Sequence, residues 1–335
     1  MKKFVLMLFV LLIFTNFLQA EEEDKINPNM DNLIESDRLD TKGNGEIGKF
    51  DKKTGKLIEG RRISKHIIEK SGIFDEKTGH LISGDIQYFS GKLKFESGTF
   101  DPKSGKLIEG VRKTEHPDIN YSYIEESGKY DIRSGYLTEG YYDYSSNYSA
   151  LSFTGSFDPK TGNFMEGRLV QSNTEHISFI SEGKFDIKTR KLKEGKKTTL
   201  QYRKHINPDL EPLELVVLEG KFDSKTGNLV EGTMDFNPPN DDEAFRSEGI
   251  FDSRTGNLIK GMKKYAIETK LLEGIFDPKN GNLVEGKLTL NYRHDPGLRI
   301  EEGKFDSKTG KLKNGTVTYE DGNIVVYKNG EPNRH

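Results

Sequence analysis

The sequence contains no cysteine and no tryptophan, and hydrophobic residues make up only 33% of its 335 positions, against about 45–50% in ordinary globular proteins. Without cysteine there can be no disulfide bond, no thiolate-ligated metal and no thiol nucleophile. The length would suit about two or three domains, but so few apolar side chains cannot fill that many thick cores. A thin core is therefore expected.

Positive charge is not in excess either, because 51 Lys and Arg face 54 Asp and Glu, for a formal net charge of −3. A nucleic-acid-binding surface needs a basic face that displaces counterions from the phosphates. The charge balance therefore argues against a nucleic acid as the partner.

A long apolar run occurs only at the start of the chain. Lys2 and Lys3 precede the unbroken apolar residues 4–14, and the small residue Ala20 follows shortly after. This arrangement is typical of a secretory signal, and the run is shorter than the about 20 apolar residues of a membrane-spanning helix. We expect residues 1–20 to be a cleaved signal peptide, with an uncleaved anchor as the alternative and no later membrane span. The mature protein would then lie in the periplasm, on the cell surface or in the medium.

Glycine is abundant, with 35 residues, and most of it belongs to one repeated pattern. The pattern G-x-F-D-x-K-T-G-x-L-x-x-G occurs ten times, with substitutions, at a mean spacing of about 28 residues. The copies begin at Gly48, Gly72, Gly98, Gly128, Gly155, Gly183, Gly220, Gly249, Gly274 and Gly303. Their spacing varies because the segments between copies differ in length, as loops do.

Each copy predicts one β-hairpin. Its Asp can accept a backbone hydrogen bond within the turn, and its eighth-place Gly supplies the positive φ that a short hairpin loop needs. The Phe before the loop and the Leu after it would face each other as an apolar pair. In the sixth copy Arg190 stands at the turn glycine. A left-handed Arg costs about 1 kcal/mol, so we expect that turn to be looser.

Ten such hairpins predict an all-β fold: an elongated antiparallel meander of about 20 strands, a solenoid-like single sheet in which each copy contacts mainly its neighbours. At about 4.8 Å per strand, its length would be on the order of 100 Å. Asp321-Gly322 predicts a tight turn in one further hairpin. The expected divisions are an acidic polar N-terminal tail over residues 21–47, with at most one or two helical turns near residues 30–39, the repeats over 48–315, and a capping hairpin with a short tail over 316–335.

The repeats resemble two known families. The segment from Glu219 through Gly227 to Gly232 is similar to bacterial MORN-type repeats, in which a glycine, an aromatic residue and a turn glycine define successive hairpins of a long sheet. The stretches Tyr319-Glu320-Asp321-Gly322 and Tyr327-Lys328-Asn329-Gly330 are closer still, although the other hairpin loops of this chain are longer. Tyr130-Asp131 and the nine Phe-Asp pairs, each followed by Gly and Leu, also resemble the YD repeats of large bacterial surface and toxin shells. Both resemblances imply a scaffold or interaction surface.

Three patterns imitate ligand sites. The Asp of every copy is followed two places on by Lys or Arg, which opposes calcium binding. Residues 40–51 resemble the start of an EF-hand loop, but Lys42 stands where an oxygen ligand is required. Residues 281–287 match a phosphate loop, but Leu288 replaces the Ser or Thr that holds magnesium. We therefore expect turns at these places, and neither a metal nor a cofactor.

Tyrosine is concentrated in one part of the chain, where eight of the 14 tyrosines lie between positions 121 and 148. Tyrosine is enriched at recognition surfaces, so a platform for a peptide or glycan is one interpretation. The preference of tyrosine for half-exposed strands is the other. The candidate binding residues are Tyr121, Tyr123, Tyr136, Tyr141, Tyr142, Tyr144 and Tyr148.

No catalytic residue stands out, because the seven histidines show no metal-ligand spacing and no G-x-S-x-G motif is present. We expect an exported, non-enzymatic bacterial repeat protein that acts as a scaffold for binding another protein. The first alternative is a structural envelope or adhesin-like surface protein that contacts an envelope or host-surface ligand. The second is a carbohydrate-binding protein.

Overall fold

The computed structural model describes residues 32–64, 68–89, 93–116, 122–146, 149–173, 177–201, 212–239, 243–266, 269–291 and 297–333. The expected signal peptide, residues 1–20, lies outside these ranges. Across the described residues, no helix has the length and apolar character needed to cross a membrane.

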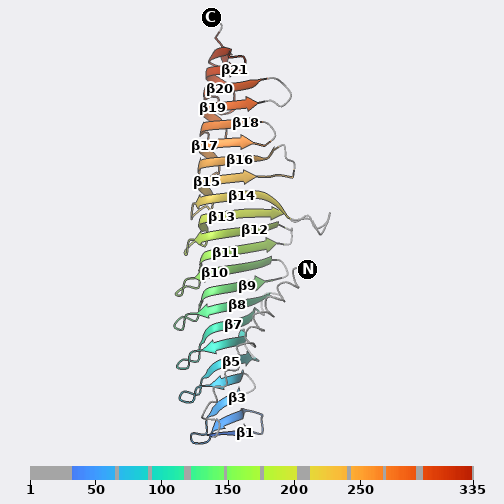
Figure 1. Ribbon diagram of the computed structural model, residues 1–335, viewed down its shortest axis with the longest axis vertical. Helices are drawn as coiled ribbons and strands as arrows, with labels where there is room; N and C mark the ends of the chain where they lie inside the picture. Colours follow the sequence, from blue (N-terminus) through green and yellow to red (C-terminus); the bar gives the residue numbers. More distant parts are fainter. Residues whose placement is uncertain are drawn as a thin grey trace.

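The described chain forms one 23-stranded antiparallel sheet in which each strand pairs with the next along the sequence (Figure 1). The sheet is open, so the expected elongated all-β hairpin meander is confirmed. The strands are β1 (Leu33–Leu39), β2 (Gly45–Asp51), β3 (Leu57–Ser64), β4 (Ile68–Phe74), β5 (Leu81–Tyr88), β6 (Leu93–Phe100), β7 (Leu107–His116), β8 (Ser122–Tyr130), β9 (Leu137–Ser145), β10 (Ser149–Phe157), β11 (Phe164–Asn173), β12 (Ile177–Phe185), β13 (Leu192–Gln201), β14 (Leu213–Phe222), β15 (Leu229–Phe236), β16 (Phe245–Phe251), β17 (Leu258–Tyr265), β18 (Thr269–Phe276), β19 (Leu283–Asn291), β20 (Leu298–Phe305), β21 (Leu312–Tyr319), β22 (Ile324–Lys328) and β23 (Glu331–Pro332).

The repeated glycines set the register of the whole sheet. Within a hairpin, the glycine before the Phe pairs with the glycine that ends the motif, as Gly155 pairs with Gly167. The same glycines also pair across the connectors, as Gly140 pairs with Gly155. The motif glycines of β2 to β21 therefore form one continuous row across the sheet, which we call the glycine row, from Gly48 to Gly315.

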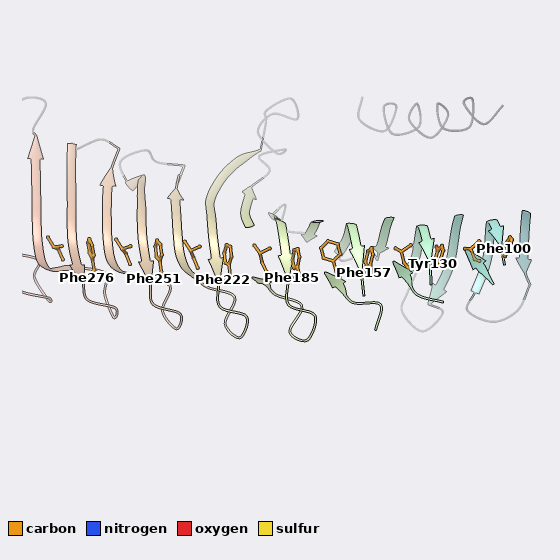
Figure 2. Close-up of a cluster of buried hydrophobic side chains, with 14 of the residues drawn as sticks. Phe100, Tyr130, Phe157, Phe185, Phe222, Phe251 and Phe276 are labelled. Atoms are coloured by element: carbon orange, nitrogen blue, oxygen red, sulfur yellow. The ribbon is translucent and has the colours of Figure 1, made fainter. Parts of the chain in front are cut away.

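Only glycine fits in this row. A Cβ on Gly155 would lie 2.0 Å from the carbonyl oxygen of Glu166 and 2.9 Å from the Cα of Gly167, and the φ of Gly155 is +151°. The other members of the row show the same close approach. Neighbouring backbones thus come closer than any side chain would allow. Figure 2 shows the strands bending near the labelled aromatic side chains.

The hydrophobic core is a single file of side chains along the sheet (Figure 2). Each hairpin contributes the aromatic residue before its loop and the apolar residue after it, and these two are paired, as Phe50 is with Leu57. Both side chains of this pair are 0% exposed. The thin core and the facing Phe and Leu are therefore confirmed, and they explain how a chain with few apolar residues folds.

The hairpin loops share one hydrogen-bond pattern. In the seventh copy, the N–H of Gly227 donates to the carbonyl of Asp223 at 2.7 Å, and the Asp223 carboxylate accepts from the N–H and hydroxyl of Thr226 at 2.6 and 3.0 Å. In the sixth copy, the N–H of Arg190 donates to the carbonyl of Asp186 at 2.7 Å, and the φ of Arg190 is +62°. The expectation of a looser sixth turn is wrong, because Arg190 adopts the left-handed conformation that glycine adopts elsewhere.

In eight of the ten copies, the side chain after the turn residue lies within hydrogen-bond distance of a backbone carbonyl of the next loop. The side-chain amide of Asn228 donates to the carbonyl of Ser253 at 2.9 Å, and the ammonium of Lys106 donates to that of Ile132 at 2.9 Å. His80 Nδ1 lies 3.1 Å from the carbonyl of Pro102. This position carries Lys, His, Tyr or Asn in all ten copies. The sequence thus shows a side chain that can donate a hydrogen bond at every copy, but its contact with the next loop was not predicted.

The N-terminal end of the sheet differs from the expectation. Residues 33–39 form β1, which pairs with β2 through a turn in which the Asp40 carboxylate accepts from the N–H groups of Lys42 and Asn44, both at 2.8 Å. A polar tail extending to residue 47, with helical turns near residues 30–39, is therefore wrong from Leu33 onward. Backbone pairing with β2 suffices to order this edge strand, and Arg38 covers the Phe50 ring at 3.7 Å.

The C-terminal hairpin is present as expected. Its β21 and β22 pair from Gly315↔Tyr327 to Thr318↔Ile324 around the Asp321-Gly322 turn. The short β23 follows and pairs with β22. With β1 added at the other end, the sheet has more hairpins than the ten copies of the motif.

We predict that Gly155→Ala destabilises the protein by at least about 3 kcal/mol, because a Cβ in the glycine row overlaps the opposite backbone. The control is Gly310→Ala, a turn glycine with φ +68° and nothing within 4 Å of its Cβ position, which should cost about 1 kcal/mol. Urea denaturation with hydrogen exchange of the neighbouring strands measures both. Equal losses in the two variants would contradict the argument from close approach.

We also predict that the array weakens in acid. Hydrogen bonds from the Ser or Thr three residues on hold the pKa of nine loop aspartates below the ordinary 3.8 in the folded protein. Below pH 3.8 the unfolded chain therefore binds more protons than the folded protein. The contribution of these aspartates to the free energy of unfolding is complete above the unfolded-state pKa of 3.8, and it is lost as the pH falls through the lower folded-state pKa.

A pair of variants tests this acid effect. The Asp252 carboxylate accepts hydrogen bonds from the backbone N–H groups of Arg254 and Thr255 and from the Thr255 hydroxyl. The Asp277 carboxylate accepts a hydrogen bond from the backbone N–H of Lys279, and residue 280 is Asn in place of Thr. Asp252→Asn should therefore reduce the stability at pH 7, and its dependence on pH, more than Asp277→Asn. Urea denaturation at pH 7 and pH 3 gives both values. A larger effect of Asp277→Asn would refute the capping role.

Candidate functional site

One face of the sheet carries the core and the other does not. We call the face with the core phenylalanines and leucines the inner face, and the opposite one the outer face. Because side chains alternate along a strand, residues two or four positions from the glycine row on the side away from the hairpin loops lie on the inner face. On the loop side, a register shift next to the Phe brings the Leu, three positions from its row glycine, onto the same face. Ile86 and Leu288, two positions beyond Gly84 and Gly286, are accordingly buried in the core. Residues two positions from the row therefore form a line of side chains over the core.

In the N-terminal half this line is charged. Arg62 lies 4.8 Å above the Phe74 ring, donates from Nη1 to the carbonyl of Gly79 at 2.6 Å, and pairs through Nε with Glu46 at 2.6 Å. A guanidinium over an aromatic face covers the core while its donors remain satisfied.

Arg112 repeats this arrangement in a more buried network. Its guanidinium lies 4.7 Å from the Tyr130 ring centroid, and its Nε donates to Glu96 at 2.9 Å. The hydroxyl of Tyr88 donates to the other oxygen of Glu96 at 2.8 Å, and Glu126 lies 3.6 Å from Arg112. Glu96 is only 7% exposed. These groups satisfy one another, so the charged half of the line is a covering for the core.

Burial shifts the pKa of several groups along this line. It raises the pKa of Glu126, and the neighbouring Arg112 opposes the rise. It lowers the pKa of Lys70, with a further decrease from Arg62. Burial also raises the pKa of Tyr130, whose hydroxyl has no hydrogen-bond partner among the described residues. The inner face is thus a region of low solvent access even where it is charged.

On β9 and β10 the line is aromatic. The rings of Tyr142 and Phe153 lie 5.6 Å apart, edge to face, and Phe153 lies 5.0 Å from Phe164. Phe164 in turn lies 4.8 Å from Phe185. Phe164 stands where the other nine copies have Leu, so the fifth copy widens the aromatic cluster. This cluster is the centre of the candidate site.

Two adjoining hollows open over this centre. The first has a volume of about 390 Å³, and its lining includes Tyr136, Tyr142, Leu151, Phe153, Phe164 and Arg190. The second has a volume of about 420 Å³, and its lining includes Leu169, Phe179, Leu192, Arg190, Lys197 and Asn228. Because they share Leu169 and Arg190, we treat them as one groove, which we call the central groove.

Arg190 lies between the two hollows. It belongs to the sixth hairpin loop, yet its positive charge partly offsets the rise in the pKa of Tyr142 that burial and Glu126 produce. The arginine at this turn was noticed in the sequence, but its place in a groove was not predicted. No sequence pattern near Arg190 predicts this place, because the groove is formed by strands from three successive repeats.

The structure divides the predicted tyrosine cluster among different surfaces. Tyr123 and Tyr141 lie on the outer face, 45% and 38% exposed, and burial together with Asp143 raises the pKa of Tyr141 to about 12. Tyr142 and Tyr144 lie on the inner face. Tyr136 is in the fourth loop, where its ring packs against Gly162. Tyr121 and Tyr148 lie outside the described residues.

The patterns that imitate ligand sites are parts of hairpins. The aspartates of the ten copies accept hydrogen bonds within their own loops, and residues 281–287 span the ninth turn and the start of β19. Within the described ranges, no group of three or more His, Asp or Glu is placed to hold a metal ion. The central groove, with aromatic walls and cationic side chains, is suited to binding.

Comparison of this chain with protein-family models and with curated protein sequences gives no match.

We predict that Arg190→Gly stabilises the protein by about 0.5–1 kcal/mol. A left-handed non-glycine residue costs about 1–2 kcal/mol, and the greater freedom of glycine in the unfolded chain returns about half of that. Urea denaturation measures the change, with Arg254→Ala in the exposed eighth loop as a control of about zero effect. A destabilised Arg190→Gly would mean that Arg190 makes a stabilising contact that outweighs its strain.

Proposed function

We propose that this chain is an exported, non-enzymatic binding protein that presents the inner face of its sheet to another protein. The observation that carries the proposal is the central groove, where aromatic side chains and Arg190 line adjoining hollows in the middle of a long array. Partly exposed aromatic and arginine side chains in concave sites are the usual anchors of protein interfaces. The resemblance to MORN-type repeats supports the same scaffold role, since nine of the ten copies have the row glycine, aromatic residue and turn glycine of that pattern, and the sixth has Arg190 at the turn.

A structural role is the second candidate, and the length of the array favours it (Figure 1). Each hairpin contacts mainly its neighbours, and hydrogen bonds connect adjacent loops. The result is an elongated array that could bridge two separate points. An envelope or surface component would use this length whether or not the central groove is occupied. The two candidates therefore differ in what the inner face contacts.

The test places a photo-crosslinking residue, p-benzoylphenylalanine, at one of two tyrosines. Tyr144 lies on the inner face close to the groove, and Tyr123 lies on the outer face one strand away. We expect irradiation of cells that export the protein to yield one dominant crosslinked protein from position 144 and none from position 123. Because Tyr123 is well exposed, chance collision would favour position 123 instead.

Single variants separate the two faces further. Tyr142→Ala removes an inner-face ring of the groove and should reduce the yield at position 144 several-fold, whereas Tyr141→Ala, on the outer face, should leave it unchanged. Equal labelling from positions 123 and 144, or no protein product from either, would refute the inner face as a protein-binding surface and favour the structural role.

A further inference from the structure

We infer that the central groove binds an extended peptide segment in which an acidic side chain lies two residues from an aromatic or aliphatic one. The inference rests on the proposed function and specifies the chemistry of its partner. The acidic side chain would pair with Arg190 and Lys197, and the apolar one would fill the hollow over Tyr142 and Phe153.

The positive charges in the second hollow favour binding of an anion. Arg190 and Lys197 both line the second hollow, and the side chain of neither one pairs with any group in the described part of the chain. The third cation of this hollow, Lys191, already donates to the carbonyl of Lys225. A carboxylate that pairs with these two cations would form charge-assisted hydrogen bonds.

The backbone at Arg190 supports a specific role for this side chain. The other nine copies of the turn use glycine at φ between +68° and +81°, and Arg190 adopts the same conformation at a cost of about 1 kcal/mol or more. Strain of this kind is concentrated at functional sites, where a side chain is needed in a place that the backbone does not favour. The residue that replaces glycine here is the one that reaches between both hollows.

The dimensions suit an extended chain. From Tyr142 on β9 to Lys197 on β13 there are four strand steps of about 4.8 Å, or about 19 Å. An extended peptide covers about 3.3 Å per residue, so about six residues span this distance, and side chains two positions apart point the same way. Arg190 lines both hollows, so an acidic side chain that pairs with it can lie two positions from the side chain that fills the apolar hollow, while a segment of about six residues covers the whole groove as far as Lys197.

An acidic glycan fits the groove less well. Sugars need many hydrogen-bonding side chains and flat, exposed rings. The deepest rings of the cluster, Phe157 and Phe164, are only 4% and 6% exposed and are tilted against each other by 59°. In the first hollow the lining side chains are mostly aromatic or aliphatic, so an apolar side chain inserted there makes better contact than a sugar face laid on top.

The test uses the full chain and a fluorescein-labelled hexapeptide, Phe-Ser-Glu-Ser-Leu-Ser, with a second peptide that has Gln for Glu. We expect saturable binding by fluorescence anisotropy, about tenfold weaker with Arg190→Gly, and partly restored with Arg190→Lys. Arg254→Ala, in an exposed loop outside the groove, should bind as the parent protein does.

The glutamine peptide should bind the parent protein about tenfold more weakly than the glutamate peptide does. Because glycine is the native residue of the nine equivalent turns, Arg190→Gly is expected to fold, which thermal unfolding checks.

Several outcomes would overturn the inference. No saturable binding, or equal binding by the parent protein and Arg190→Gly, would exclude the groove as an acidic-peptide site. Competition by oligogalacturonate but not by the unlabelled peptide would assign the groove to an acidic glycan. Self-association that Arg190→Gly abolishes, seen by sedimentation, would assign it to a second copy of this chain. A protein crosslinked at position 144 in the absence of peptide binding would leave the proposed function intact and refute only this refinement.

Discussion

The close approach of neighbouring backbones along the glycine row is the constraint on which the rest of the structure depends. On each strand from β2 to β21, the space for a Cβ on the row glycine is occupied by a carbonyl oxygen of the adjacent strand, as it is by the carbonyl oxygen of Glu166 at Gly155. A register slip of one residue would bring a side chain into that space. The row therefore aligns the strands, and it places each Phe and Leu of the motif in the same file.

A single-file core has a physical consequence for the inner face. One aromatic and one aliphatic side chain per hairpin cannot shield each other completely, so the next line of residues must cover them. In the N-terminal half, Arg62 and Arg112 lie over aromatic rings with their donors paired to Glu46, Glu96 and loop carbonyls. In the centre, the covering residues are themselves aromatic, and the hollows of the central groove form between them.

The same scaffold thus carries different surfaces on equivalent positions. Positions two residues beyond the glycine row hold arginine in the third repeat, tyrosine in the fourth and leucine in the fifth, namely Arg112, Tyr142 and Leu169. None of these changes disturbs the glycine pairing or the core file. A repeat array can therefore vary its inner face along its length while its fold stays constant, and Arg190 adds a local departure from the turn rule at the place where that face is hollowed.

The repeated hairpins, their turns, the facing Phe and Leu and the thin core could be predicted from the sequence, because they depend on contacts within a motif of 13 residues that is repeated ten times. It could not reveal that residues 33–39 form a strand, since an edge strand is ordered by backbone pairing with β2 and needs little apolar patterning. The division of the tyrosines between two faces was within reach of strand alternation once the register was known. The central groove could not be predicted in this way, because Tyr142, Phe153, Arg190 and Lys197 lie in different strands and loops and are brought together only when the repeats stack side by side.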